Sequence, residues 1–400
     1  MPATGSGLNI LYVGTLPPHP GGSAILASHL LGGLTKLGNS VRALAPITAE
    51  ALQGGDRFAL SHPSIAVRRF LVPRFETAPN IAPLDDYRAL ERAQIQELLP
   101  ILIGDGRPDI IIIGRETFAW HVPDLARAHS LPCILLIQGG TTHGILMRTF
   151  PAVEAQQLLE QFRKANCVVA VAEHLAESLR PLGVNRIKVI PNPVDMHRFS
   201  PGLKDGALRR ELAIPEDNIV ILHVSNLKPV KRPLDLVSSA ERALQENSKL
   251  VYVIVGDGPC REIMEEACKK KLISASFKFV GWVDHDRVAD YINLGDMVVM
   301  PSEAEGQALV YLETQACARL LLASDIPAAR EVIVDAETGL LFRKGNIEDL
   351  TAKTLLVAGE PKLRAAIGRK ARQQVKAHAL NNVVATYAFV LAEVVQELRG

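Results

Sequence analysis

Short apolar runs alternate with amphipathic stretches along the chain, and they do so in two separate blocks. Alternation of this kind predicts βα units whose strands form a parallel sheet with right-handed crossovers. The sequence therefore predicts an α/β protein with two doubly wound, Rossmann-like domains. The predicted strands lie at 9–15, 41–45, 109–113, 133–137, 167–171 and 187–190 in the first block, and at 219–224, 250–255, 277–280, 297–300 and 320–323 in the second.

A proline-rich stretch separates the two blocks. Residues 191–201 contain three prolines, which is typical of a linker. We therefore expect an N-terminal domain at 1–190, the linker at 191–201 and a C-terminal domain at 202–375. Residues 376–400 are predicted to form a final helix. One alternative for this helix is that it packs back on the N-terminal domain. Because parallel α/β sheets bind ligands at the carboxyl ends of their strands, we expect the two domains to face each other across a cleft.

The composition excludes several classes of protein. A formal net charge of +1 gives no electrostatic reason to expect a nucleic-acid partner. The five cysteines show no metal-ligand spacing, so we expect buried thiols and no metal. Neither a basic leader nor an apolar run of the ~20 residues that span a bilayer is evident. We therefore expect a cytoplasmic protein, with the option of peripheral contact with the inner face of the membrane through the basic and apolar residues 68–74.

The most specific segment is 301–313. A predicted strand stops at Pro301, a turn containing Gly306 follows, and a helix is predicted to begin near Ala308. A helix N-terminus after a strand offers unpaired N–H groups for a phosphate. Glu305 and Glu313 flank this point, and a carboxylate can accept hydrogen bonds from the vicinal hydroxyls of a sugar. The alternative is that Glu305 caps the helix and that Glu313 is a solvated surface residue.

The spacing of Glu305 and Glu313 closely resembles the E-x7-E signature of the retaining GT-B glycosyltransferases of family 4. Other segments follow in the order of that family, and the resemblance covers nearly the whole chain. They are a glycine-rich loop (17–22), an N-P-V-D linker segment (192–195), a phosphate loop (223–232) and a G-x-G-P turn (256–259). The phosphate loop, S-N-L-x-x-V-K-R, is similar to that of the branch that makes glucosaminyl-malate for bacillithiol.

The resemblance implies a role for each matching residue of the donor site. Glu313 is expected to hold the donor ribose and Glu305 the hydroxyls of the transferred sugar. Lys231 is expected to neutralise the diphosphate. The remaining donor contacts are expected from Gly21 and Gly22 of the first loop, from Gly256, from the backbone around Trp282 and Val283 for the nucleobase, and from the amides of Gly306, Gln307, Ala308 and Leu309 for the diphosphate.

Several positions depart from the family pattern. Asn226 replaces an arginine that contacts phosphate in the family, and Lys228 is our candidate for the missing charge. Gln138-Gly139 replaces the usual His-Gly, so either Gln138 or His143 is expected to contact the sugar. Ala328-Ala329 replaces a frequent glycine, and this replacement is expected to affect the choice of donor.

Two other features complete the interpretation. For the acceptor we name Arg115 and Glu116, together with His143, at the strand ends of the first domain. Asp284-His285-Asp286 mimics a D-x-D metal clamp, but Asp284 precedes an amphipathic run and is interpreted as a helix N-cap.

The predicted function is transfer of a hexose, of the glucose or N-acetylglucosamine type, with retention of anomeric configuration. The donor is a nucleotide-sugar, expected to be UDP-linked, and it acts as a substrate, so no cofactor is expected. The sequence does not identify the acceptor, which is expected to belong to glycan or glycoconjugate biosynthesis; a lipid-linked glycan and a small molecule are the two options. The alternatives are a UDP-sugar 2-epimerase of the same architecture and a non-catalytic GT-B binding subunit.

Overall fold

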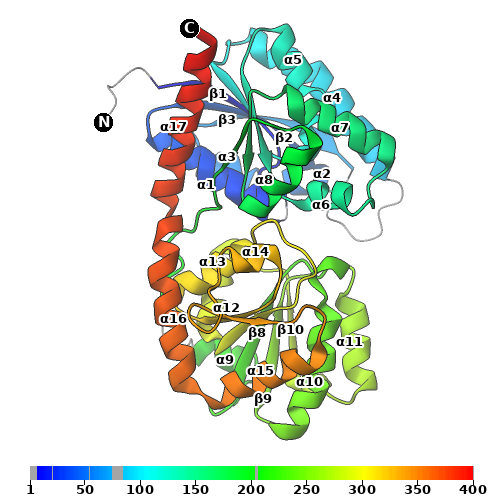
Figure 1. Cartoon of the computed structure of the whole chain (residues 1–400), viewed down its shortest axis with the longest axis vertical. Helices are drawn as coiled ribbons and strands as arrows, with labels where there is room; N and C mark the ends of the chain where they lie inside the picture. Colours follow the sequence, from blue (N-terminus) through cyan, green and yellow to red (C-terminus); the bar gives the residue numbers. More distant parts are fainter. Residues whose placement is uncertain (1–6, 20, 54, 74–83, 203–205, 400) are drawn as a thin grey trace. The chain divides into compact units, whose positions relative to one another are not determined.

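The computed structural model describes residues 7–19, 21–53, 55–73, 84–202 and 206–399. The chain divides into two compact units, and each is described by itself. Unit 1 is the chain up to Pro193 together with the segment from Leu380 onward, and unit 2 is Val194–Ala379. Each unit is an α/β layer structure around one parallel sheet (Figure 1). The predicted fold class, two doubly wound Rossmann-like domains, is confirmed.

The sheet of unit 1 has the strand order β3-β2-β1-β4-β5-β6-β7. The order reverses direction between β1 and β4, which makes their carboxyl ends the switch point of a doubly wound sheet. The strands are β1 (Asn9–Val13), β2 (Ser40–Thr48), β3 (Ala66–Val72), β4 (Ile110–Ile113), β5 (Cys133–Ile137), β6 (Cys167–Ala170) and β7 (Ile187–Val189).

Helices cover both faces of this sheet because its strands are apolar on both sides. One face packs on α4, α5, α7 and α8, and the other packs on α1 and on the C-terminal helix α17. Figure 1 shows α17 alongside α1. The helices are α1 (Gly22–Lys36), α2 (Ala49–Gln53), α3 (Arg57–Ser61), α4 (Leu84–Gly104), α5 (Val122–Ala128), α6 (Gly140–Leu146), α7 (Ala152–Lys164), α8 (Glu173–Leu179) and α17 (Leu380–Arg399), with 3₁₀ turns η1 (Glu116–Trp120) and η2 (Arg180–Leu182).

The sheet of unit 2 has the order β10-β9-β8-β11-β12-β13. Successive residues of β8 show how it is buried. Val220 and Leu222 face the core beside α12 and α13, whereas Ile221 faces the core beside α10, α11 and α15. This alternation is the period of a strand that is covered on both faces. The strands are β8 (Ile219–Val224), β9 (Leu250–Val255), β10 (Phe277–Gly281), β11 (Met297–Met300), β12 (Leu320–Ser324) and β13 (Leu340–Phe342).

The remaining elements of unit 2 follow its strands along the chain. They are α9 (Gly206–Glu211), α10 (Pro233–Glu246), α11 (Arg261–Lys270), α12 (His285–Leu294), α13 (Leu309–Ala316), α14 (Pro327–Arg330), α15 (Ile347–Gly359) and α16 (Pro361–Val375), with η3 (Pro229–Lys231), η4 (Ser274–Ser276) and η5 (Lys376–His378).

The segment 68–74, for which we expected contact with a membrane surface, exposes Arg68 and Leu71. Most of it forms the edge strand β3, which the sequence analysis missed. The Arg69 side chain is only 9% exposed, because it pairs with Asp56 at 2.7 Å and donates to the carbonyl oxygen of Pro17. Arg69 therefore stabilises the fold instead of contributing to a basic surface. Arg74 lies outside the described residues.

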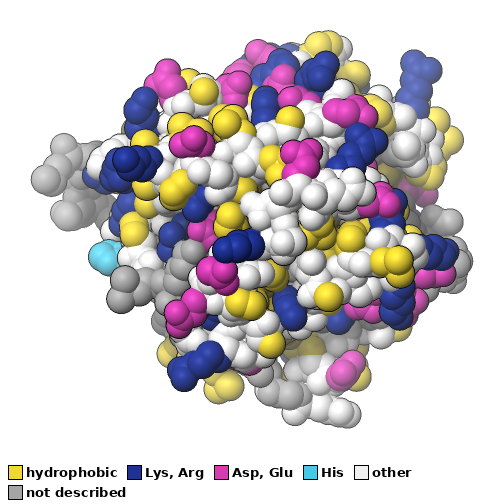
Figure 2. Space-filling view, turned by 90° about the horizontal axis from the view of Figure 1, so that it is seen from below, with side chains coloured by type: hydrophobic (Ala, Val, Ile, Leu, Met, Phe, Trp, Pro, Cys, Tyr) yellow, Lys and Arg dark blue, Asp and Glu magenta, His cyan; other side chains and the backbone are white. Residues whose placement is uncertain are grey.

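Two further observations concern the surface. In the part of the chain that the structure describes, no helix is long and apolar enough to cross a membrane. On the face that Figure 2 shows, basic and acidic side chains are interspersed.

Candidate active site

The candidate site of unit 2 is formed by loops at the carboxyl ends of neighbouring strands. β8 lies between β9 and β11 in the sheet, so the loops that follow these three strands lie next to one another. The loop after β8 carries Asn226, Lys228 and Lys231. The loop after β11 carries Glu305 and leads into α13, which contains Glu313. The sheet therefore brings together residues that are far apart in the sequence.

Glu305 is buried, and both of its carboxylate oxygens accept hydrogen bonds. Ser302 Oγ donates to Glu305 Oε1 at 2.6 Å, and Lys231 Nζ donates to both carboxylate oxygens at 2.7 and 2.6 Å. The N-cap of α13 is Ala308, so Glu305 does not cap this helix. Buried carboxylates require such partners, and Lys231 supplies the compensating charge.

The two loops that carry Lys231 and Glu305 are braced against each other. The backbone N–H of Glu303 donates to the carbonyl of Val230 at 2.7 Å. The Glu303 carboxylate accepts hydrogen bonds from Lys344 at 2.7 Å and from Arg232 at 2.8 Å, and these partners lower the pKa of Glu303. The position of Lys231 beside Glu305 is thus fixed by backbone and side-chain contacts outside the pair itself.

Glu313 is also buried, with 5% of its surface exposed, so it is not a solvated surface residue. His285 Nε2 lies 2.6 Å from Glu313 Oε1. Sequence reasoning missed His285. Its signal was the Asp284-His285-Asp286 motif, which we interpreted only as the start of a helix. Asp284 does occupy the N-cap position of α12, although its side chain makes no capping hydrogen bond.

A second missed histidine shapes the loop that follows β8. His223 is fully buried, its Nδ1 lies 2.9 Å from the carbonyl oxygen of Val299, and its Nε2 lies 2.8 Å from Ser225 Oγ. Ser225 Oγ in turn accepts the N–H of Leu227 at 3.1 Å. Burial lowers the pKa of His223 to about 4, so the ring is neutral near pH 7. A neutral ring that donates to Val299 can accept the Ser225 proton, which gives this chain of bonds a fixed direction.

Gly256 supports the same loop through close backbone approach. A Cβ atom at Gly256 would lie 1.8 Å from the carbonyl oxygen of Ser225, and one at Gly258 would lie 2.0 Å from that of Asn226. Gly256 also has φ +115°, a conformation that favours glycine. Asn226 is exposed and Lys228 is half-buried on the loop that these glycines support.

The predicted donor residues at 282–283 and 306–309 also lie at the carboxyl ends of strands of the unit 2 sheet. Trp282 follows β10 and is 61% exposed, and Val283 beside it is half-buried. Gly306 and Ala308 are half-buried and Gln307 is buried, directly before Leu309, the first residue of α13. The first turn of this helix supplies N–H groups without intrahelical partners.

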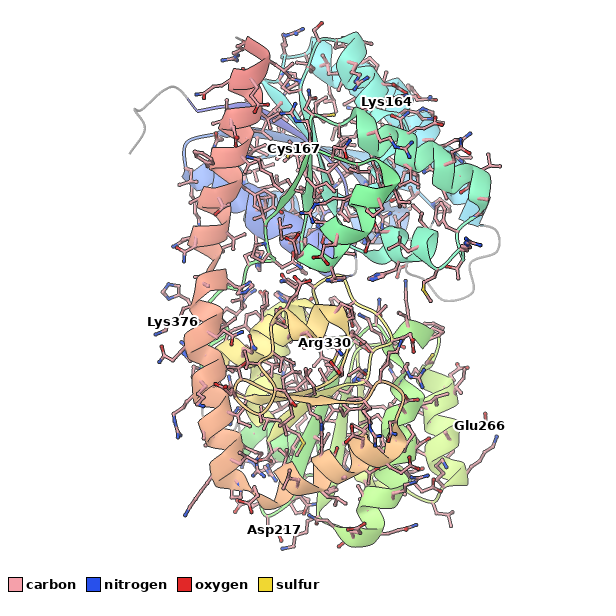
Figure 3. The ribbon with its side chains drawn as sticks, viewed as in Figure 1. Lys164, Cys167, Asp217, Glu266, Arg330 and Lys376 are labelled. Carbon is pink, nitrogen blue, oxygen red and sulfur yellow. The ribbon has the colours of Figure 1, made fainter. Side chains whose placement is uncertain are left out.

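Ala328 and Ala329 lie inside the fold. Both are buried in the core of unit 2, on α14. Arg330, the last residue of α14 (labelled in Figure 3), pairs with Asp325. The effect on donor choice that we expected from the two alanines has no support in their position.

In unit 1, Glu116 holds the loop that follows β5. Glu116 is 2% exposed, and its Oε1 accepts the N–H of Gly139 at 2.8 Å and the hydroxyl of Thr142 at 3.1 Å. Gly139 has φ +100°, and half-buried Gln138 precedes it. Glu116 is therefore engaged inside the protein, which does not fit the direct contact with an acceptor that we predicted for it.

Other predicted residues of unit 1 lie at the same edge of its sheet. The His143 ring on α6 lies 6.1 Å from that of His174 on α8. The Arg115 side chain is mostly buried, with its guanidinium over the Phe118 ring and 3.9 Å from Glu91. Gly21, at φ +113°, is the N-cap of α1, and Gly22 begins that helix.

Two family models match the chain, one in each half. Residues 20–198 match the family described as Glycosyltransferase Family 4, and residues 205–374 match the family described as Glycosyl transferases group 1.

Curated relatives are similar over part of their length. A D-inositol 3-phosphate glycosyltransferase of Kribbella flavida is 29% identical over 196 residues, which are 46% of this chain and 46% of the relative. The glycogen synthase of Mycobacterium tuberculosis is 25% identical over 275 residues, 67% of this chain and 64% of the relative. The matched regions thus span about half to two thirds of these relatives.

Solved structures resemble the whole chain. HepE of Anabaena in complex with UDP has a TM-score of 0.75 at 18% identity, covering 96% of this chain and all of its own. Sucrose-phosphate synthase of Thermosynechococcus elongatus has a TM-score of 0.82 at 17% identity, covering 97% of this chain and all of its own. At this level of identity the likeness establishes the GT-B fold.

Proposed function

We propose that this chain, which carries the family 4 and group 1 domains of the GT-B glycosyltransferases, transfers a hexose from a UDP-sugar to an acceptor hydroxyl with retention of anomeric configuration. One observation carries the proposal. Lys231, buried Glu305, buried Glu313 and the N-terminus of α13 converge at the carboxyl edge of one sheet. This set offers a cation and N–H groups for a diphosphate, and carboxylates for sugar hydroxyls.

Each group has a distinct task in the proposed donor complex. The amides at 306–309 and Lys231 bind the diphosphate, and Glu313 accepts hydrogen bonds from the ribose. Glu305 accepts hydrogen bonds from hydroxyls of the transferred hexose. HepE, a solved structure of similar fold, has been determined with UDP and glucose, which supports a UDP-linked hexose as the donor.

The proposed reaction takes place on one face of the sugar. The bond between the anomeric carbon and the phosphate oxygen breaks, and the acceptor oxygen forms its bond to that carbon on the same face. The acceptor proton passes to the leaving phosphate oxygen. Lys231 and the N-terminus of α13 stabilise the charge that develops on the leaving UDP, which is the main contribution of the protein to the rate.

A nucleotide screen followed by product analysis tests the proposal. UDP at ~100 times its dissociation constant adds about 2.7 kcal/mol to the stability of the protein, whereas other nucleotides add less. UDP-α-glucose or UDP-α-N-acetylglucosamine, incubated with candidate acceptors that include D-inositol 3-phosphate, gives free UDP and an α-linked product. Proton NMR identifies the linkage from its anomeric coupling.

The same experiment separates the alternatives. A β-linked product would exclude the retaining reaction. A UDP-sugar 2-epimerase would convert the donor to its 2-epimer without transferring the sugar to an acceptor, and a binding subunit would consume no donor.

A further inference from the structure

We propose that His285 is a positioning residue for the donor nucleotide: it holds Glu313 in the orientation in which this carboxylate accepts hydrogen bonds from the ribose. The inference rests on the proposed function, because it takes Glu313 to be the ribose contact. It adds a residue that sequence reasoning placed only at the start of a helix.

The contact between the two side chains is short and largely shielded from water. His285 Nε2 lies 2.6 Å from Glu313 Oε1, and the side chains are 17% and 7% exposed. Because an ionised carboxylate only accepts hydrogen bonds, His285 must carry a proton on Nε2. The bond uses Oε1 of Glu313, and a carboxylate that is held at one oxygen presents the other in a defined direction.

The His285 ring is itself held in place. It is the first residue of α12, and its centroid lies 5.3 Å from that of fully buried Phe199, at an angle of 52°. The next residue, Asp286, pairs with Arg198 at 2.5 Å, so two consecutive residues of α12 contact the segment before α9. Because the His285 ring is fixed in this way, its N–H group can orient Glu313 in the absence of ligand.

The two signature glutamates solve the same physical problem with different partners. Lys231 and Ser302 hydrogen-bond Glu305, whereas His285 is the partner that the described residues provide for the Glu313 side chain. A buried ionised carboxylate without a donor either takes up a proton or turns toward water. Either response reduces its ability to accept two hydrogen bonds from vicinal hydroxyls.

The test compares two substitutions of His285 by calorimetry and by steady-state kinetics. His285→Phe keeps a ring against Phe199 but removes the N–H group that donates to Glu313. It should raise both the Kd for UDP and the KM for the UDP-sugar about tenfold. The kcat should change by less than roughly twofold, since Glu313 contacts the part of the donor that does not react. His285→Gln keeps an N–H donor and should restore most of the affinity.

Two further measurements distinguish positioning from a general loss of structure. In a Glu313→Gln background, His285→Phe should change the Kd for UDP by less than roughly twofold, because the two effects share one contact. His285→Phe should also reduce the affinity for 2′-deoxy-UDP less than the affinity for UDP, because 2′-deoxy-UDP lacks one of the hydroxyls that Glu313 is proposed to contact. Asp290→Asn, at an exposed residue further along α12, is the matched control and should bind UDP like the unaltered chain.

The outcomes separate the inference from the proposed function. If the unaltered chain does not bind UDP, the proposed function fails, and the inference fails with it. If it binds UDP and His285→Phe binds equally well, only the inference fails. Equal losses of affinity for UDP and 2′-deoxy-UDP in His285→Phe would also overturn the role of His285. Additive effects of His285→Phe and Glu313→Gln on the Kd for UDP would do the same.

Discussion

At the residue scale, the phosphate loop departs at Asn226 from the family pattern that it resembles, and the structure shows what surrounds that position. Asn226 is exposed on a loop that Gly256 and Gly258 support, and Lys228 and Lys231 follow on the same loop. An asparagine can donate a hydrogen bond but carries no charge, so charge for a diphosphate must come from the lysines.

We therefore expect Lys231→Ala to reduce turnover most, by ~10²–10³-fold, and Lys228→Ala to cost at least as much as Asn226→Ala. Turnover at saturating donor for the three variants is the measurement. Lys249→Ala, an exposed lysine that pairs with Asp217, serves as the control. A Lys228→Ala enzyme that turns over at the rate of the unaltered chain would show that Lys231 and the N-terminus of α13 alone stabilise the charge of the diphosphate.

Buried His223 predicts a dependence of stability on pH. Burial lowers its pKa from 6.5 to about 4, so at pH 7 the ring is neutral in both folded and unfolded chains. Between these values the unfolded chain binds a proton that the folded chain excludes. The free energy of unfolding should thus fall as pH falls through this window, by about 3 kcal/mol in total.

Urea unfolding at about pH 7 and about pH 5 measures this slope. At about pH 7, His223→Gln should be less stable than the unaltered chain. Its free energy of unfolding should fall less between about pH 7 and about pH 5, because the contribution of His223 is absent. His197→Gln, at an exposed histidine, should keep it. Equal slopes for His223→Gln and the unaltered chain would contradict the assignment.

At the scale of elements, the site depends on how closely the turn after β9 approaches the loop after β8. A methyl group at Gly256 would meet the Ser225 carbonyl at 1.8 Å, and φ there is +115°. We expect Gly256→Ala to lower the free energy of unfolding by at least about 2 kcal/mol and to weaken UDP binding, because the loop must move.

The matched control for this change is Gly359→Ala, at the last residue of α15, where an added Cβ meets nothing within 4 Å. An alanine there should be neutral or stabilising by up to about 1 kcal/mol. Urea unfolding and calorimetry with UDP give both quantities for each variant. Normal stability of Gly256→Ala would show that the loop adapts without cost.

At the scale of the whole molecule, each unit has cores of its own, and α17 belongs to the core of unit 1. Leu391 is fully buried there, among residues of α1 and the sheet, whereas Phe389 on the same helix is 64% exposed. Two side chains at β7 also pair with α17: Arg186, directly before the strand, pairs with Glu397, and Lys188, in its middle, pairs with Glu393.

Leu391→Ala should therefore destabilise unit 1 by about 2–5 kcal/mol, while Phe389→Ala should change stability by less than about 0.5 kcal/mol. Scanning calorimetry should show one transition lowered, and the Kd for UDP should stay unchanged because the proposed UDP contacts, Lys231, Glu313 and the amides at 306–309, lie in unit 2. Weakened UDP binding in Leu391→Ala would show that unit 2 depends on the core of unit 1.

The sequence by itself determined the strands of both sheets apart from the edge strands β3 and β13, the two-domain fold and the spacing of Glu305 and Glu313. These features are written in local patterns: apolar runs, turn residues and fixed spacings. The edge strand β3 was not predicted because arginines interrupt its apolar pattern. The burial of Arg69 depends on its ion pair with Asp56, which lies elsewhere in the sequence.

The tertiary structure alone decided which partners the key side chains have. Lys231 meets Glu305 across 74 positions of sequence, His223 meets Val299 across 76, and His285 meets Glu313 across 28. No local pattern encodes such pairs, because they arise when parallel strands place their carboxyl ends side by side. Whether Glu313 is solvated or buried was likewise set by the packing of α12 and α13, and this packing also gave Glu313 its histidine partner.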